Sequence, residues 1–105
     1  MDDVIISAGW TISSSEVEDA LQKHSAVEEA VVVGAPDKDR GQIVKAYLKV
    51  NKEPSEALKK EIQDFVKAQL SKHEYPRAIE FVNEIPKTTG GKIDRKKIKE
   101  WAAAG

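Results

Sequence analysis

Residues 30–50 read AVVVGAPDKDRGQIVKAYLKV, and this stretch decides how the chain folds. The apolar run at 30–34 predicts a buried strand, which we expect at the centre of a sheet because its residues are apolar on both faces. From Val44 to Val50 apolar residues alternate with lysine and tyrosine, which predicts a second strand with one buried face. The charged turn between them, residues 35–41, has a length compatible with a hairpin. The two strands are therefore predicted to pair antiparallel.

The segments on either side of this pair complete a small α+β domain that we expect to occupy residues 1–105. The predicted order is β-α-β-β-α-β-α. It gives a three-stranded, mainly antiparallel sheet with a short extra N-terminal strand or hairpin, and helices packed on the sheet. The outer elements are expected as a strand at 4–6, a helix that starts at 13–16 and runs to Lys23, a helix over 58–70, a strand at 79–82 and a last helix over 95–103.

Two serines mark the starts of the first two helices. Ser13 and Glu16 have the spacing of a capping box, in which each side chain satisfies a backbone N–H of the first turn. Ser55 precedes the second helix in the same way. His24, at the end of the first helix, is interpreted as a residue favoured by the negative C-terminal end of the helix dipole.

The composition narrows the classes of function. The chain has a formal net charge of −1, so it has no overall attraction to nucleic acid or to an anionic membrane. It contains no cysteine, which excludes disulfide and thiol chemistry and is compatible with the cytoplasm. Its two histidines, His24 and His73, are isolated, so no metal site is predicted. No apolar run is long enough for a membrane span.

The segment PKTTGGK at 86–92 differs from the rest of the chain. It has two glycines and no large apolar side chain, so we expect a mobile loop. A cation on such a loop can neutralise a phosphate or a carboxylate. It is not a nucleotide-binding P-loop, because Pro86 stands where that motif needs glycine and Ile93 stands where it needs Ser or Thr. From the spacing alone, a surface turn with solvated lysines remains the alternative.

Two segments near opposite ends of the chain, DDVIISAGWTI at 2–12 and PKTTGGK at 86–92, together resemble the C-terminal domain of the adenylate-forming enzymes. That family includes acyl-CoA synthetases, peptide-synthetase adenylation domains and luciferases. The turns at 36–41 and 75–77 are also similar, so the resemblance covers essentially the whole chain. Residues 39–46, DRGQIVKA, are most similar to the acetate and medium-chain acyl-CoA synthetase branch.

The resemblance implies a two-step ligase reaction. A carboxylic acid attacks the α-phosphate of ATP to give acyl-adenylate and pyrophosphate, and the thiol of CoA then displaces AMP. It also implies that an N-terminal adenylation domain of the same chain holds ATP, Mg²⁺ and the acid. The present chain would be the mobile lid of that cytoplasmic enzyme. Alone it would be inactive and would bind none of these ligands tightly. The resemblance implies neither a nucleic-acid partner nor a membrane span.

The resemblance further implies roles for individual residues. Lys92 is similar to the lysine of the adenylation step, because a cation relieves the repulsion between the acid and the α-phosphate. Asp2, within a hinge remnant at residues 1–3, is similar to the residue about which the lid turns. Gly9 and Trp10 are similar to residues of the CoA channel, where a side chain on Gly9 would narrow the passage.

Two arginines extend the resemblance, and at two positions the chain departs from the family pattern. Arg40 and Arg77 are similar to turn residues that contact the CoA nucleotide in some relatives, and solvated turn arginines are the alternative. Thr11 stands where many relatives have arginine, which puts a phosphate contact from that position in doubt. Gly90 stands where many have a polar residue. No residue is implied as a metal ligand.

A different class of function also fits part of the sequence. The basic C-terminal segment would suit a phospholigand or nucleic-acid binding module. The near-neutral net charge and the lack of interleaved aromatic residues weaken this alternative. The segment consists of Lys92, Arg95, Lys96, Lys97 and Lys99.

Overall fold

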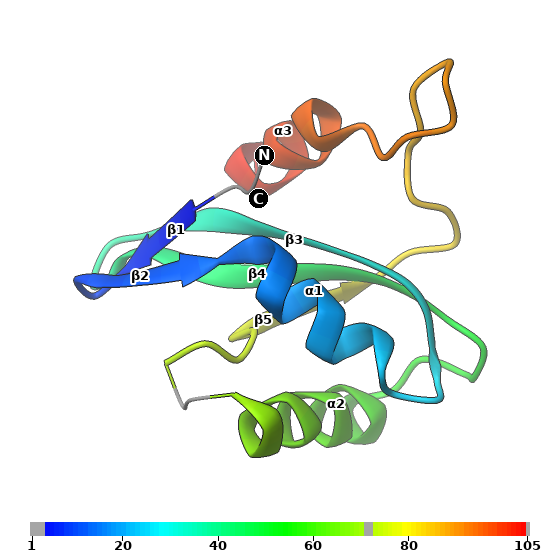
Figure 1. Ribbon diagram of the computed structural model, residues 1–105, viewed down its shortest axis with the longest axis horizontal. Coiled ribbons are helices and arrows are strands. Elements are labelled where there is room, and N and C mark those ends of the chain that lie inside the picture. The colour runs from blue at the N-terminus through cyan, green and yellow to red at the C-terminus, as the bar shows by residue number, and fades with distance from the viewer. Residues whose placement is uncertain (1–3, 71–72, 105) are drawn as a thin grey trace.

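The computed structural model describes residues 4–70 and 73–104 (Figure 1). It confirms the α+β class, and the predicted N-terminal strand is the first arm of a separate two-stranded hairpin. In this part of the chain the elements are β1 (Val4–Ser7), β2 (Trp10–Ser13), α1 (Ser14–Gln22), β3 (Val27–Asp37), β4 (Gly41–Val50), α2 (Glu56–Gln69), β5 (Ala78–Phe81) and α3 (Arg95–Ala104).

The predicted antiparallel pair is confirmed as β3 and β4, which are longer than expected. Their register runs from Val27 opposite Val50 to Asp37 opposite Gly41, so the connecting turn shrinks to residues 38–40. The order of the sheet is β3-β4-β5, which makes β4 the central strand. The expectation that the 30–34 strand is central is therefore wrong. That run is apolar because helices cover both faces of an edge strand.

The third strand gives the sheet its mixed character. β5 runs parallel to β4, with Ala46 opposite Ile79. A parallel neighbour needs a crossover connection, and α2 supplies it between the two strands. The sheet is thus mixed, with one antiparallel and one parallel pairing, and not mainly antiparallel as expected.

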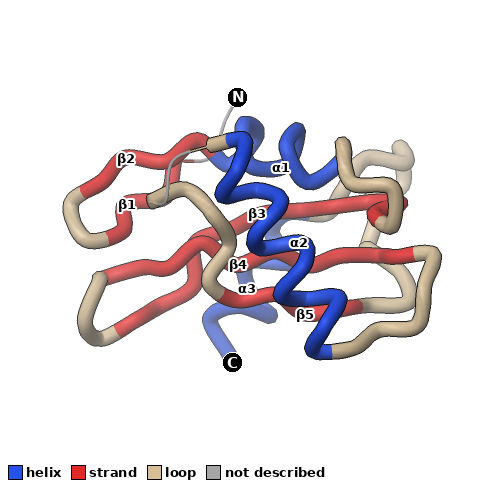
Figure 2. The backbone as a smooth tube through the Cα atoms, turned by 90° about the horizontal axis from the view of Figure 1, so that it is seen from below, coloured by secondary structure: helices blue, strands red, loops and turns tan. Residues whose placement is uncertain are grey.

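The core lies on both faces of this sheet. Figure 2 shows α2 in front of the strands and α3 behind them. One face packs against α1, α2 and the β1–β2 hairpin, and its core includes Ile5, Ile12, Val17, Leu21, Val32, Ala46, Leu48, Ile62, Val66 and Ile79. The other face packs against α3 and the segment before it, through Val31, Val33, Ala35, Tyr47, Ile85, Ile98 and Ala102.

Both predicted helix caps are confirmed. The Ser13 hydroxyl accepts a hydrogen bond from the backbone N–H of Glu16 at 3.4 Å. The Ser55 hydroxyl accepts one from Leu58 at 3.0 Å. Each cap satisfies an N–H that the first helical turn leaves without a partner.

His24, which follows the last turn of α1, is a buried packing residue. It is 7% exposed, and its Nδ1 accepts a hydrogen bond from the backbone N–H of Ala26 at 3.1 Å. Its Nε2 therefore carries the proton and donates to Glu61 Oε2 at 2.6 Å. Its ring also meets the edge of Phe65 on α2. The histidine thus joins the end of α1 to α2.

Candidate functional site

The segment at residues 86–94, here called the lysine loop, is a closed miniature hairpin. Lys87 and Ile93 form an antiparallel bridge, and the N–H of Asp94 donates to the carbonyl of Pro86 at 2.9 Å. At the tip, Gly91 takes a φ of +82°, which favours glycine. Lys92 follows it on the returning arm and is exposed. In Figure 1 the loop projects as an orange arch beyond α3.

The two lysines of the loop differ in their surroundings. Lys87 Nζ lies 2.8 Å from Glu29 Oε1, a carboxylate of β3. Lys92, in contrast, forms no ion pair with the residues that the structure describes. Lys92 is therefore the loop cation placed to meet an external anion.

A second ion pair lies where the lysine loop ends and α3 begins. Arg95, the first residue of α3, donates from Nη2 to Glu18 Oε1 at 2.7 Å. Glu18 is a buried residue of α1, and its other oxygen, Oε2, accepts the backbone N–H of Val32 at 2.8 Å. One member of the basic C-terminal segment is thus paired within the domain.

The tip of the β1–β2 hairpin is tied to the turn between β3 and β4. Ala8 and Gly9 have φ values of 50° and 85°, as in the two-residue type I′ turn that closes many hairpins. The N–H of Ala8 donates to the carbonyl of Arg40 at 2.9 Å, and Arg40 Nε donates to Ser7 Oγ at 3.1 Å. A Cβ built on Gly9 would meet no atom within 4 Å, so its outer side is open.

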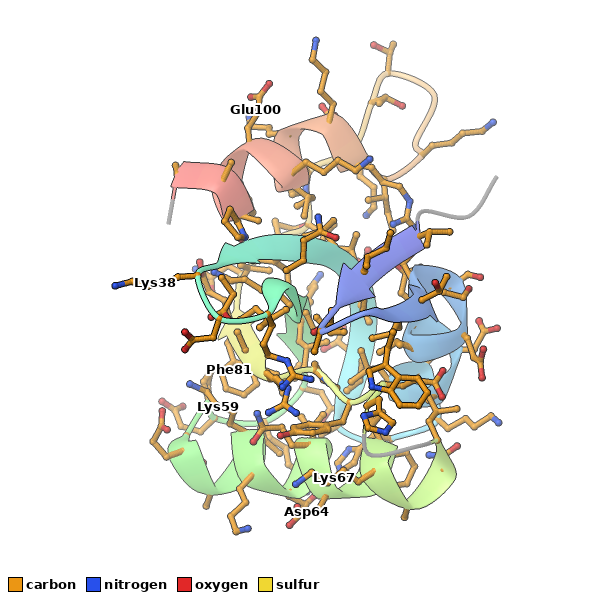
Figure 3. The ribbon with its side chains drawn as sticks, turned by 90° about the vertical axis from the view of Figure 1, so that its left-hand side faces the viewer. Lys38, Lys59, Asp64, Lys67, Phe81 and Glu100 are labelled. Carbon is orange, nitrogen blue, oxygen red and sulfur yellow. The ribbon has the colours of Figure 1, made fainter. Side chains whose placement is uncertain are left out.

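An open cleft of about 480 Å³ lies between this hairpin, the β3–β4 turn and α2. Figure 3 looks onto this end of the molecule, with the hairpin above α2 and its labelled Lys67. The cleft brings together three residues expected at the CoA site: Trp10, Arg40 and Arg77. Its lining consists of Ala8, Trp10, Arg40, Lys67, His73, Tyr75 and Arg77.

Aromatic rings and cations alternate in this cleft. The rings of Trp10 and His73 stack with centroids 3.9 Å apart. Lys67 Nζ lies 4.3 Å from the centroid of the Tyr75 ring, and the Arg77 guanidinium carbon lies 5.0 Å from it. Guanidinium and ammonium groups bind phosphates, and exposed rings stack on planar bases. The arrangement is chemically suited to an anionic ligand that carries a flat ring.

The protein-family model for the AMP-binding enzyme C-terminal domain matches residues 16–92 of the chain. The chain belongs to this family. It is 49% identical over 102 residues to mitochondrial acyl-coenzyme A synthetase ACSM1 of Mus musculus, covering 93% of this chain and 18% of that protein. It is 47% identical over 103 residues to acetyl-coenzyme A synthetase of Bacillus subtilis, covering 96% of this chain and 18% of that protein.

Solved structures of acyl-CoA synthetases contain a domain with the same fold. The crystal structure of Brucella canis acyl-CoA synthetase superposes with a TM-score of 0.91 at 48% identity, over 95% of this chain and 19% of that one. The present chain therefore spans about a fifth of the length of its relatives. Over that fifth it matches the C-terminal domain of AMP-binding enzymes, and the relatives named here are acyl-CoA synthetases.

In this AMP-binding C-terminal domain, the two groups of site residues lie at opposite ends. The hairpin tip, which borders the cleft, is at one end, and the lysine loop projects from the other (Figure 1). Thr11 lines a neighbouring hollow with Trp10 and His73, outside the cation-rich cleft. The proposed hinge residue Asp2 lies outside the described residues.

Three cleft residues were missed as site residues from the sequence. Tyr75 belongs to a turn that was singled out without a role, and His73 was dismissed as an isolated histidine. Lys67 is one of several lysines on the polar face of α2. Only the packing of α2 beside the hairpin distinguishes it, so no local pattern could have found it.

Two negative findings apply to residues 4–70 and 73–104. They contain no group of three or more His, Cys, Asp or Glu side chains that could hold a metal ion. They also contain no helix of sufficient length and hydrophobicity to cross a membrane.

Proposed function

We propose that this chain is the moving part of an AMP-forming acyl-CoA synthetase and that it delivers different residues to the two half-reactions. The observation that carries the proposal is the separation of an exposed lysine, Lys92, from a cationic cleft at the far end of one rigid sheet. A single orientation of the domain cannot present both ends to one catalytic centre. The domain therefore turns between the steps, and we assign the hinge to Asp2.

In the first step, a carboxylate oxygen of the acid attacks the α-phosphorus of ATP. A bond forms between that oxygen and phosphorus, and the bond to pyrophosphate breaks. Two anions approach each other in this step, so the Lys92 ammonium stabilises the charge that accumulates between them. Removal of one such donor typically costs about 10²- to 10³-fold in rate.

In the second step, the thiol of CoA attacks the carbonyl carbon, the bond to AMP breaks, and the thiol proton passes to solvent. We assign the nucleotide end of CoA to the cleft. Arg40, Lys67 and Arg77 supply cations for its phosphates, and Tyr75 and Trp10 supply rings beside its base. Gly9, with open space where a Cβ would stand, leaves room for the pantetheine arm.

The other ligands belong to an N-terminal domain of the same chain in this proposal. That domain holds ATP, Mg²⁺ and the carboxylic acid, while the present chain alone is inactive and binds none of them tightly. The lack of cysteine leads us to propose the cytoplasm as the compartment, although several relatives carry a mitochondrial designation. We propose no nucleic-acid partner, because Arg95 of the basic segment is engaged by Glu18.

The test uses a chimera in which this chain replaces the matching C-terminal segment of Brucella canis acyl-CoA synthetase. Acyl-adenylate formation is measured as pyrophosphate release with the acid that the parent enzyme uses. Thioester formation is measured from supplied acyl-adenylate and CoA. Lys92→Ala should slow the first reaction about 10²- to 10³-fold and spare the second, and Lys96→Ala, an exposed lysine of α3, is the matched control.

Variants of the cleft should show the opposite pattern. Arg40→Ala and Arg77→Ala are expected to raise the KM for CoA about tenfold each, as for loss of one phosphate contact, with the KM for ATP unchanged. Equal damage to both half-reactions by Lys92→Ala and by the arginine variants would show that the two ends do not serve separate steps.

A further inference from the structure

We propose that two ion pairs anchor the feet of the lysine loop to β3 and that Glu18, Arg95, Glu29 and Lys87 are positioning residues for Lys92. This inference deepens the proposed function and rests on it, because it concerns the reach of the same lysine. The two pairs flank the loop in the sequence: Lys87 lies five residues before Lys92, and Arg95 lies three residues after it.

The downstream anchor joins Arg95, whose side chain is 36% exposed, to a carboxylate that is mostly buried. Both oxygens of Glu18 are used, one by Arg95 Nη2 at 2.7 Å and one by the N–H of Val32 at 2.8 Å. Val32 lies in β3, an edge strand, so this N–H points away from the sheet and finds its acceptor in the Glu18 carboxylate. The Glu18 side chain is only 12% exposed. In such surroundings a charge-assisted pair is strong, and loss of one partner leaves a buried charge without compensation.

The upstream anchor reaches the same strand directly. Glu29 is a residue of β3, and its carboxylate oxygen lies 2.8 Å from Lys87 Nζ. This pair is partly exposed, with side chains 36% and 29% accessible, so it contributes less than the Arg95–Glu18 pair, whose carboxylate is more deeply buried. Lys87 is thus linked to β3 directly, and Arg95 is linked to it through Glu18 of α1, on either side of the bridge between Lys87 and Ile93.

Between these anchors Ile93 is the hydrophobic side chain of the loop that packs against the core. Apart from its internal hydrogen bonds, such as Thr88 N–H to the carbonyl of Lys92 at 2.7 Å, residues 87–92 are exposed. Ile85 before the loop and Ile98 after it are the nearest fully buried side chains. The two ion pairs therefore act together with the packing of Ile93 to fix the position of the loop, and that position sets where the Lys92 ammonium arrives. A displacement of about 1 Å at a reacting centre can cost about 10²-fold in rate.

The first measurement is amide hydrogen exchange on the 105-residue chain, which does not depend on activity. Arg95→Ala and Lys87→Ala should each speed exchange at the bonded N–H groups of Thr88, Gly91 and Asp94 by about tenfold or more, because local opening becomes easier. Exchange in β4 should stay slow, which shows that the domain is still folded. Lys96→Ala, an exposed neighbour of Arg95 on α3, should change neither.

The second measurement is the adenylation half-reaction of the chimera. Arg95→Ala and Lys87→Ala should lower its kcat about 10- to 100-fold and leave the KM for ATP and the thioester half-reaction within about twofold. Arg95→Lys should recover part of the rate, because it restores the charge but not the guanidinium geometry. The exchanged pair Lys87→Glu with Glu29→Lys should recover most of it, and this pair avoids the buried site if Arg95→Ala fails to fold.

The outcomes distinguish the inference from the proposed function. If Lys92→Ala abolishes adenylation while the anchor variants leave kcat unchanged, the function stands and the positioning role is overturned, whether or not exchange has increased. If Lys92→Ala leaves adenylation unchanged, the proposed function fails, and the exchange data alone still decide whether the two pairs hold the loop. Failure of the exchanged pair to recover either readout would also overturn the upstream anchor.

Discussion

Substitution of Gly9 at the hairpin tip is expected to change the stability of the domain slightly and to affect one half-reaction selectively. Gly9 has a φ of +85°, and a Cβ built there meets nothing within 4 Å. Gly9→Ala therefore adds backbone strain without a clash. A Cβ in the left-handed region costs about 1–2 kcal/mol, and the smaller entropy of the unfolded chain offsets about 0.4–1 kcal/mol of this. We expect a net loss of about 1 kcal/mol in the free energy of unfolding.

Gly91 provides a matched partner in the lysine loop. It has a φ of +82° and the same open surroundings, so Gly91→Ala should be destabilising to the same extent. Thermal unfolding followed by circular dichroism should show that the Tm falls by about 4–8 °C for each variant, as about 1 kcal/mol does in domains of this size. The two variants then differ only in which end of the molecule they perturb.

The half-reactions of the chimera should reveal that difference. Gly9→Ala, and more severely Gly9→Leu, should slow thioester formation and spare adenylation, because the added side chain occupies the proposed CoA channel. Gly91→Ala should slow adenylation and spare thioester formation. The reasoning is refuted if both variants impair the same half-reaction. It is also refuted if Gly9→Ala costs more than about 3 kcal/mol, because strain alone does not reach that value.

Two further predictions concern stability. Gly34→Ala would place a Cβ 2.7 Å from Gln42 Nε2 and displace the Gln42 side chain, whose Oε1 accepts a hydrogen bond from the N–H of Ile6 at 3.0 Å. Loss of that hydrogen bond should lower the free energy of unfolding, measured by urea titration, by about 1 kcal/mol. The double variant with Gln42→Ala should be no less stable, because the same hydrogen bond is lost in both. The Glu84 carboxylate, by its hydrogen bond and its charge, raises the pKa of Lys49 above 10.5. This stabilisation is present below pH 10.5 and is lost as the pH rises through the raised pKa. Glu84→Gln should therefore flatten the decline of stability measured above that pH, and an unchanged slope would contradict the assignment.

The sequence by itself determined the features that depend on near neighbours. Alternation from Val44 to Val50 identified β4, and the serine caps fixed the starts of α1 and α2, because periodicity and capping act within a few residues. The same local signals gave the α+β class. The segments at 2–12 and 86–92 carried the resemblance that the family match later showed.

Tertiary structure decided what depends on residues far apart in the chain. Nothing near Glu18 indicates that its partner is Arg95, 77 residues away, or that Lys87 is held by Glu29 while Lys92 projects. Likewise Arg40, Lys67 and Arg77 come from three separate segments, and only the docking of the hairpin and α2 around the sheet places them in one cleft. Even the edge position of β3 was hidden, because a strand covered on both faces has the same apolar pattern at the edge as at the centre. Such contacts arise from how layers pack, and packing is a property of the whole chain rather than of any stretch within it.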